Sequence, residues 1–166
     1  MKTLILLSAI PGSGKSTWAK KYQQEHPNTF IVSSDEIRKN LTGIFQSFTK
    51  EDEVWRIFLE KINEFAVNYT DVTVIADATN LQNVYRRYYL EATPLFNKHV
   101  LVLFNIPYEI CLLQNKLRPA DKIVPDYAME KLHKEFEEPS QEIINLYDEY
   151  RIIGPNFISE KIKEKI

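Results

Sequence analysis

The stretch that decides the fold reads Ser8-Ala9-Ile10-Pro11-Gly12-Ser13-Gly14-Lys15-Ser16-Thr17. An apolar run at residues 4–7 precedes it, and Trp18-Ala19-Lys20-Lys21-Tyr22 follows it. This order indicates a strand, a glycine-containing loop and a helix. Because Gly12 and Gly14 lack a Cβ, the backbone can adopt left-handed dihedrals and direct successive N–H groups into one concavity. Such a concavity suits phosphate oxygens.

The helix that begins near Lys15 adds the positive end of its dipole at the same place. Lys15 can reach the β- and γ-phosphates of a nucleoside triphosphate, and the Ser16 hydroxyl is positioned to ligate Mg²⁺. The stretch fits the pattern G-x-x-x-x-G-K-[ST] except that Ala9 stands at the first glycine. The alternative is an ordinary strand-to-helix turn with a surface lysine. The expected phosphate-binding residues are Pro11, Gly12, Ser13, Gly14, Lys15, Ser16 and Thr17.

Length and composition favour one globular domain over residues 1–166, since a chain of this size buries about 70% of its extended surface. The net charge of −2 argues against broad electrostatic capture of nucleic acid, so any such contact should be confined to a short strand end. Cys111 is the single cysteine, which excludes a disulfide framework and favours a reducing compartment. No apolar run approaches the roughly 20 residues that span a bilayer. We expect a cytoplasmic protein with no membrane partner.

Hydrophobic patterning along the chain alternates between strands and helices. Strands are expected at 4–7, 29–32, 72–76, 99–104 and 150–153. Helices are expected at 15–25, from Ser33-Ser34-Asp35 onward, from 49 or 50 to 69, and at 80–92, 107–117 and 125–137. The tail to Ile166 alternates Lys and Glu, which indicates a solvated helix or a frayed end. The alternation predicts an α/β fold with a mainly parallel sheet of about five strands.

Three candidate groups follow the first three expected strands. They are the glycine loop, Asp35 and Asp77. Ligands of parallel α/β sheets bind at the carboxyl ends of the strands, so these groups are expected to meet at one edge.

The rest of the sequence narrows the reaction. A GTPase needs an Asn-Lys-x-Asp motif, but the Asn-Lys pairs at residues 97–98 and 115–116 are not followed by the required Asp. ATP-driven machines commonly place a glutamate after the strand-end aspartate to activate water, whereas Ala78 follows Asp77 here. Water is therefore not the evident nucleophile, and transfer to a bound hydroxyl remains.

Such a transfer needs a carboxylate near the acceptor hydroxyl and cations around the phosphoryl oxygens. Asp35 is our candidate general base, although an aspartate that satisfies the first N–H groups of a helix fits the same position. Arg38 lies one turn further on and could bind an anionic group of the acceptor. An exposed helix arginine is the alternative.

Further candidates come from the third strand end and from an irregular segment near residue 120. Asp77 could hold Mg²⁺ or fix Lys15 and Ser16, or it could be a buried capping aspartate. Thr79 and Asn80 could contact the acceptor or form an ordinary turn. Arg118 and Lys122 lie in a segment with lid character and could close over the triphosphate, or they could be solvated surface charges.

Four segments together resemble the P-loop 5′-hydroxyl polynucleotide kinases. They are Ile10 through Ala19, Ser34-Asp35-Glu36-Ile37-Arg38, Asp77-Ala78-Thr79-Asn80 with Arg86-Arg87, and Arg118 through Val124-Pro125. The resemblance runs in the same order to about Phe136. It implies an adenylate-kinase-like P-loop kinase fold with a mobile lid, and transfer of the γ-phosphate of ATP to a 5′-OH end of DNA or RNA with Mg²⁺.

The resemblance also implies roles for individual residues. Lys15 and Ser16 would serve the donor phosphates and the metal, and Asp35 would activate the 5′-hydroxyl. Arg38 would hold the neighbouring phosphate of the acceptor, and Arg118 would be the lid arginine. Weaker expectations near the acceptor fall on Thr79, Asn80, Arg86 and Arg87. Since no phosphatase or ligase domain follows, we expect a stand-alone kinase module.

Two other functions fit the same residues. A P-loop kinase for a small acceptor, such as a nucleoside, nucleotide or sugar nucleotide, would share Lys15, Ser16 and Asp35. An ATP-binding switch that hydrolyses slowly would share the glycine loop but would not need the Asp35 carboxylate.

Overall fold

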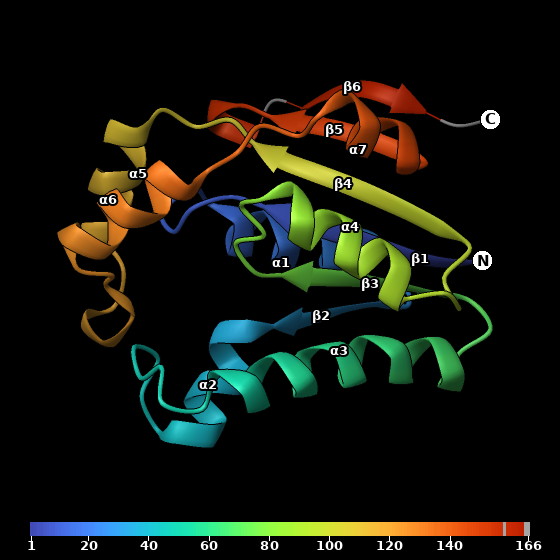
Figure 1. Cartoon of the computed structure of the whole chain (residues 1–166), viewed down its shortest axis with the longest axis horizontal. Coiled ribbons are helices and arrows are strands. Elements are labelled where there is room, and N and C mark those ends of the chain that lie inside the picture. The colour runs from blue at the N-terminus through green and yellow to red at the C-terminus, as the bar shows by residue number, and fades with distance from the viewer. Residues whose placement is uncertain (158, 165–166) are drawn as a thin grey trace.

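The computed structural model describes residues 1–157 and 159–164. Its centre is a sheet with the strand order β2-β3-β1-β4-β5-β6. The first five strands in this order are parallel, and β6 runs antiparallel to β5. The strand bounds are β1 Lys2–Ser8, β2 Thr29–Ser33, β3 Val72–Asp77, β4 Lys98–Phe104, β5 Glu149–Ile153 and β6 Ser159–Glu164. In Figure 1 the carboxyl ends of β2, β3 and β4 all point to the left edge of the sheet.

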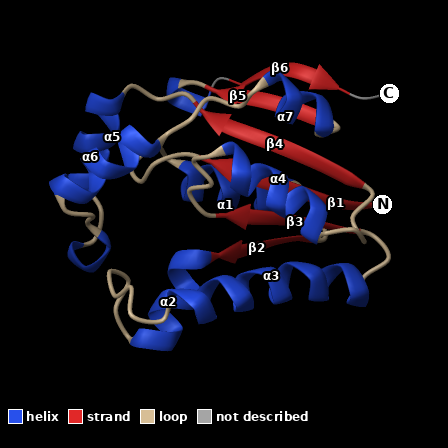
Figure 2. Cartoon of the chain, in the orientation of Figure 1, coloured by secondary structure: helices blue, strands red, loops and turns tan. Residues whose placement is uncertain are grey.

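Helices cover both faces of the sheet (Figure 2). One face packs against α1, and the other packs against α3, α4 and α7. Two more helices, α5 and α6, lie beyond the carboxyl ends of the strands. The bounds are α1 Lys15–Glu25, α2 Ser34–Thr42, α3 Glu51–Asn68, α4 Asn83–Ala92, α5 Tyr108–Lys116, α6 Asp126–Glu135 and α7 Gln141–Leu146. Among the helices of the described ranges, none is long and apolar enough to cross a lipid bilayer.

The central strand β1 is apolar on both faces. Leu4 and Leu6 belong to the hydrophobic cluster under α3 and α4, while Ile5 and Leu7 belong to the cluster under α1. All four side chains are nearly inaccessible to solvent. Successive side chains of a strand point to opposite faces, so a continuous apolar run is what a strand buried between two helical layers requires.

The predicted fold class is confirmed, with two differences in detail. The tail expected as a solvated helix or frayed end forms β6 over Ser159–Glu164, while Lys165 and Ile166 lie outside the described residues. Charged side chains are compatible with an edge strand, where they discourage pairing with another chain. The helix expected at 80–92 begins only at Asn83, because Asn80 has a positive φ of 43° and residues 80–82 are irregular.

Helix α2 begins as the sequence predicts. The side chain of Ser33 accepts a hydrogen bond from the Glu36 backbone N–H at 3.3 Å, which caps the first turn. Asp35 therefore lies in the first turn of α2, directly after the carboxyl end of β2.

Candidate active site

The loop between β1 and α1 needs glycine at two positions. Gly12 has a φ of 83°, and a Cβ there would overlap the carbonyl oxygen of Cys111 in α5. Gly14 has a φ of 89°, and a Cβ there would lie 3.1 Å from the ring of Phe157. Both left-handed backbones favour glycine. Contacts with Cys111 and Phe157 therefore favour glycine at both positions.

Ala9, which stands where the motif usually has glycine, meets no such constraint. Its φ is not positive, and its backbone N–H donates a hydrogen bond to the Thr79 carbonyl oxygen at 2.9 Å. Its methyl group is buried in the cluster under α1. The alanine therefore leaves the loop geometry intact.

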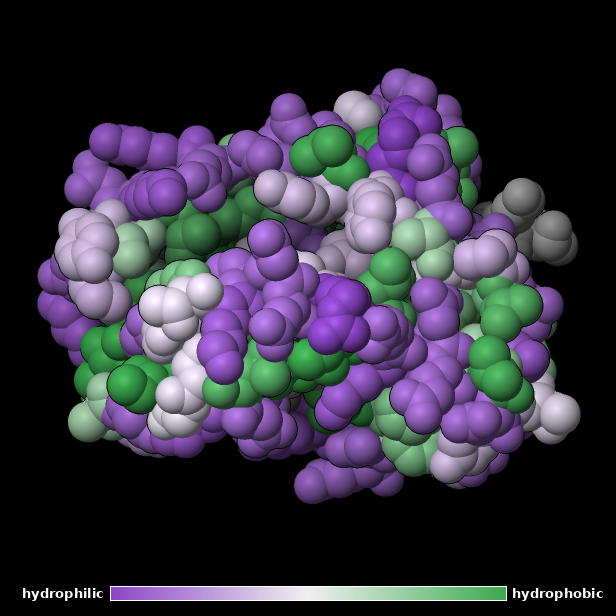
Figure 3. Space-filling model, turned by 60° about the horizontal axis from the view of Figure 1, so that its bottom comes forward, coloured by the Kyte–Doolittle hydropathy of each residue, from purple (hydrophilic) through white to green (hydrophobic). Residues whose placement is uncertain are grey.

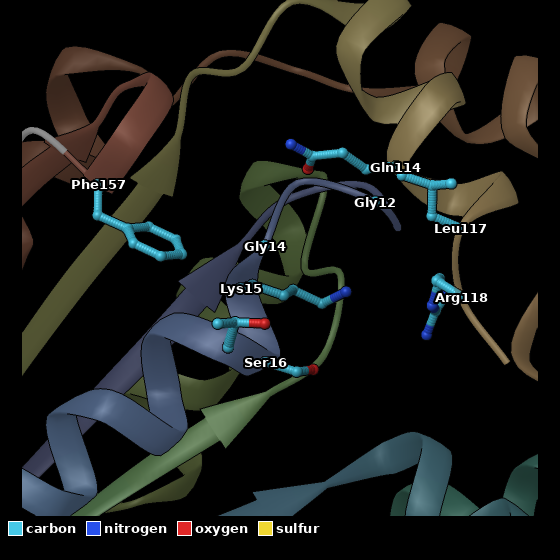
Figure 4. Close-up of a pocket in the computed structure, with 9 residues that line it drawn as sticks. Gly12, Gly14, Lys15, Ser16, Gln114, Leu117, Arg118 and Phe157 are labelled. Carbon is cyan, nitrogen blue, oxygen red and sulfur yellow. The ribbon is translucent and has the colours of Figure 1, made fainter.

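A cavity of about 360 Å³ opens beside this loop. Figure 4 shows Lys15, Ser16 and Arg118 around one open space, with the ring of Phe157 on the other side of the loop. Lys15 is 8% exposed, so it is not the surface lysine of the alternative interpretation. The described lining residues are Gly12, Gly14, Lys15, Ser16, Thr17, Gln114, Leu117, Arg118 and Phe157.

The loop residues fit a triphosphate. The Ser13 hydroxyl is buried and has no hydrogen-bond partner among the described residues, which is unusual for a buried polar atom and marks it as a ready donor for a ligand. Lys15 contributes positive charge at the amino end of α1. Together with the glycine backbone these groups have the chemistry that phosphate oxygens require.

Ser16 and Asp77 join the loop to the end of β3. The Ser16 hydroxyl donates a hydrogen bond to Asp77 Oδ2 at 2.8 Å. Burial raises the pKa of the Asp77 carboxyl, and it outweighs the opposing effects of Lys15 and of the Ser16 hydrogen bond. Asp35 and Arg118 also act on this pKa, so these charged groups share one small region. A hydroxyl and a carboxylate fit the oxygen-ligand preference of Mg²⁺.

Asp35 lies between two arginines. Arg38 Nη1 donates to Asp35 Oδ1 at 2.8 Å, and Arg118 Nη2 lies 4.0 Å from Asp35 Oδ2. Glu51, the first residue of α3, accepts two further hydrogen bonds from Arg38 at 2.7 and 2.9 Å. Burial alone would lower the pKa of the Arg38 guanidinium, but Glu51 and Asp35 raise it above its ordinary value. Arg38 is thus a buried cation that orients Asp35, rather than an exposed helix arginine.

The segment after α5 contacts α2 through charged pairs. Lys122 Nζ lies 3.7 Å from Glu36 Oε1, and Lys39 Nζ lies 3.9 Å from Asp121 Oδ2. Both lysines also lie within about 5 Å of the Phe45 ring centre. Lys122 therefore faces α2 and is not among the residues that line the phosphate cavity, whereas Arg118 is.

Thr79 and Asn80 continue the chain beyond Asp77. The Asn80 side chain donates to the Leu7 carbonyl oxygen at 2.9 Å, and its own carbonyl accepts a hydrogen bond from the Ser8 hydroxyl at 2.7 Å. Asn80 thus ties the ends of β1 and β3 together. Thr79 borders a second and larger cavity described below.

The structure corrects the expectation for Arg86. Its side chain is 0% exposed, and its guanidinium donates to Asn83 Oδ1 at 2.9 Å, Ser8 Oγ at 3.0 Å and the Leu81 carbonyl oxygen at 3.1 Å. Burial lowers its pKa to about 10. Arg86 fastens α4 to the end of β1 and is not available to an acceptor.

Arg87, the next residue, lies on the surface of α4. Its guanidinium pairs with Glu142 and with Glu91. It lines neither cavity described here. The structure therefore does not bring Arg87 to the site, and the acceptor role expected for it has no support in the geometry.

Sequence reasoning missed Glu51 and Phe157. Phe157 follows Gly154-Pro155 at the carboxyl end of β5, which is the edge where ligands were expected, so its position offered a signal. No sequence signal pointed to Glu51, because its contact with Arg38 depends on the path of the loop between α2 and α3.

Fold and site together define a P-loop kinase-like ATP-binding domain. The family described as an AAA domain (AAA_33) matches residues 4–139, and the chain belongs to this family.

Solved structures share this fold at low sequence identity. A gluconokinase from Sinorhizobium meliloti 1021 is 20% identical, with 93% of this chain and 83% of that chain covered and a TM-score of 0.62. Kti12 from Chaetomium thermophilum, solved in complex with ADP-AlF3, is 14% identical, with 92% and 89% covered and a TM-score of 0.69. A fungal RNA kinase is 16% identical, with 99% and 78% covered and a TM-score of 0.66. These likenesses establish the fold and leave the acceptor open.

The neighbouring arginines of α4 provide a matched stability test. We expect Arg86→Ala to lower the free energy of unfolding by on the order of 3 kcal/mol, because hydrogen bonds from a buried charged group are lost and Ser8 loses a donor. Arg87→Ala should change it by about 0.5 kcal/mol or less, since its ion pairs are exposed. Urea unfolding of both variants measures this. Equal effects would contradict the structural role of Arg86.

The buried Asp77 carboxylate should lower the free energy of unfolding at neutral pH. Because folding raises its pKa, the stability that Asp77 contributes is full below the unfolded pKa of about 3.9 and is lost as the pH rises through the folded pKa. Asp77→Asn should therefore be more stable than the native chain at pH 7 without nucleotide, and the gap should narrow toward pH 4. Urea unfolding over this pH range, with exposed Asp71→Asn as the control, gives the answer. A destabilised Asp77→Asn at pH 7 would refute the account.

Proposed function

We propose that the protein is an ATP-dependent phosphotransferase that moves the γ-phosphate of ATP to a hydroxyl acceptor, and that this acceptor is the 5′-OH end of DNA or RNA. The observation that carries the proposal is the position of the Asp35 carboxylate. It lies beside Arg118, a residue of the phosphate cavity, and close enough to Asp77 to influence its ionisation. The P-loop kinase fold and the order of motifs along the chain support the same reading.

The roles of the residues follow from their positions. The loop amides and Lys15 would bind the β- and γ-phosphates, and Arg118, which lines the same cavity, would contact the γ-phosphate. Ser16 and Asp77 would hold Mg²⁺, which when bound neutralises charge on the phosphate oxygens. Asp35 accepts the proton of the acceptor hydroxyl. The hydroxyl oxygen bonds to the γ-phosphorus as the bond to ADP breaks.

Arg38 has two tasks in this proposal. Its hydrogen bond to Asp35 holds the carboxylate in one orientation, and its charge can attract the phosphate next to the reacting nucleoside. Glu51 occupies the other edge of the guanidinium. An acceptor phosphate would have to compete with Glu51 and Asp35, which together bond to all three guanidinium nitrogens, so orienting Asp35 is the main task of Arg38.

A small-molecule acceptor is the second candidate. The formal net charge is −2, and the larger cavity beside Thr79 is lined by Asp52, Glu60 and Glu135 against one arginine, Arg56. Such a surface offers little attraction to a long polyanion. Structures with this fold include a gluconokinase and a sugar kinase from Janibacter sp. HTCC2649.

Asp35→Asn tests the catalytic role of the carboxylate. We expect transfer to fall by about 10²-fold or more with ATP affinity nearly unchanged, because the proton acceptor is lost while the phosphate loop remains. Single-turnover rates with labelled ATP, together with a separate ATP-binding titration, measure this. The control is Glu36→Gln, which removes the charge of the next residue. Unchanged turnover in Asp35→Asn would favour an ATP-binding module without a transfer role.

A panel of acceptors tests the substrate class. The panel contains single-stranded DNA and RNA with 5′-OH ends, the same strands with 5′-phosphate, nucleosides, nucleotides and gluconate, each with labelled ATP and Mg²⁺. We expect label on the 5′-OH strands and none on strands whose 5′ end is already phosphorylated. Label confined to gluconate or other metabolites would reject the nucleic-acid acceptor and leave the kinase chemistry standing.

A further inference from the structure

A second cavity of about 950 Å³ opens next to the phosphate site. It lies between α3, α4 and α6, and it reaches the loop after β3 at Thr79 and Asn80. The Thr79 carbonyl accepts the hydrogen bond from Ala9 in the phosphate loop, which ties the rim of this cavity to that loop. The lining residues are Asp52, Trp55, Arg56, Leu59, Glu60, Thr79, Asn80, Leu81, Gln82, Val84, Tyr85, Tyr88, Tyr89, Leu132 and Glu135.

Aromatic rings form a fixed row across this cavity. Trp55 meets Phe58 edge to face at 5.5 Å, Phe58 meets Tyr89 at 5.6 Å, and Tyr89 meets Tyr88 at 5.2 Å. The inner rings, Phe58 and Tyr89, are buried and hold the outer rings, Trp55 and Tyr88, in place. Tyr88 and the separate lining ring Tyr85 are each 50% exposed. Edge-to-face packing is a favoured geometry, so the outer rings are presented to the cavity without reorganisation.

The charges of the lining limit what can enter. Its three carboxylates, on Asp52, Glu60 and Glu135, stand against Arg56, which pairs with Glu60 at 3.0 Å. A chain with one phosphate per nucleotide would meet net negative charge along this wall. Figure 3 shows the face that α3 brings forward, where hydrophobic patches lie among hydrophilic side chains.

One cation lies at the border with the catalytic site. The Arg38 guanidinium is 6.0 Å from the Trp55 ring centre and bonds to Asp35. The row of rings therefore begins beside the proposed general base. A planar group bound on the rings would stand near a hydroxyl at Asp35.

We propose that this cavity binds the nucleobase of the acceptor by stacking, and that it takes the terminal nucleoside alone while the rest of a strand leaves the protein. The proposal rests on the proposed function and limits what the site holds to the terminal nucleoside of the acceptor. Aromatic faces stack on any base, and a cavity of this size suits one nucleoside. Eight of the fifteen lining residues are aromatic or aliphatic, and the seven polar ones include three carboxylates, which would repel the carboxylate of a polyhydroxy acid.

Binding can be measured without any transfer. Trp55 lines the cavity, whereas Trp18 packs in α1 against Tyr22 and Phe104, so adenosine 3′-phosphate added without ATP should quench the fluorescence of Trp55 only. We expect saturable quenching that disappears in Trp55→Phe. Gluconate should cause none. Absence of quenching by the nucleotide, or equal quenching by gluconate, would overturn the proposal.

Substitution of the two half-exposed tyrosines of the lining sharpens the test. Tyr85→Ala and Tyr88→Ala should each weaken adenosine 3′-phosphate binding by about tenfold, the size expected for one lost stacking contact. Tyr127→Ala is the matched control, because Tyr127 is an exposed tyrosine of α6 that does not line the cavity. Melting temperatures verify that the variants fold. Affinity unchanged in both cavity variants would contradict the proposal.

The dependence of KM on the length of the acceptor strand tests this inference separately from the proposed function. If only the terminal nucleoside enters, KM for a 5′-OH decamer should lie within about threefold of KM for adenosine 3′-phosphate. A KM that falls by orders of magnitude with length would refute the terminal-nucleoside limit while the kinase activity stood. Nucleotide quenching without transfer to any acceptor would refute the kinase activity while the cavity assignment stood.

Discussion

The parallel pairing of β2, β3 and β1 is the constraint on which the site depends. The register sets Ser33 opposite Asp77 and Leu6 opposite Ala76, so the three strands end at the same edge. Each delivers one part of the site there: β1 leads into the glycine loop, β2 into Asp35 and β3 into Asp77. The hydrogen bond from Ser16 to Asp77 then fixes the start of α1 against β3. Without this register the residues would be distant in space as they are in sequence.

The site also contains buried groups that lower the stability of the fold. Asp77 is buried, so its carboxylate lies in surroundings that disfavour the charged form, and its pKa is raised. Ser13 keeps a buried hydroxyl without a partner among the described residues. Arg38, in contrast, is satisfied by Asp35 and Glu51. Ser13 and Asp77 thus lie in or beside the glycine loop in unfavourable surroundings, whereas Arg38 is fully paired and supports the Asp35 carboxylate.

The features of the site that could be predicted from the sequence are those set by residues close together along the chain. The glycine loop, the Ser33 cap and the spacing of Asp35 and Arg38 are set within a few residues, and the structure has each of them where it was expected. Arg86 and Arg87 show the limit, because adjacent arginines give no sign of which one turns inward. Glu51 reaches Arg38 only through the course of the loop between α2 and α3. The β6 strand depends on an edge of β5 that periodicity in the tail does not reveal.

The central claim is that the glycine loop and Asp35 act on one phosphoryl group, and a crystal structure with a non-hydrolysable ATP analogue tests it most directly. The distance to measure joins the γ-phosphorus to the nearest Asp35 carboxylate oxygen. An acceptor oxygen in line for attack and hydrogen-bonded to Asp35 predicts about 6 Å or less. Triphosphate bound outside the loop, or a γ-phosphorus more than about 9 Å from Asp35, would contradict the account.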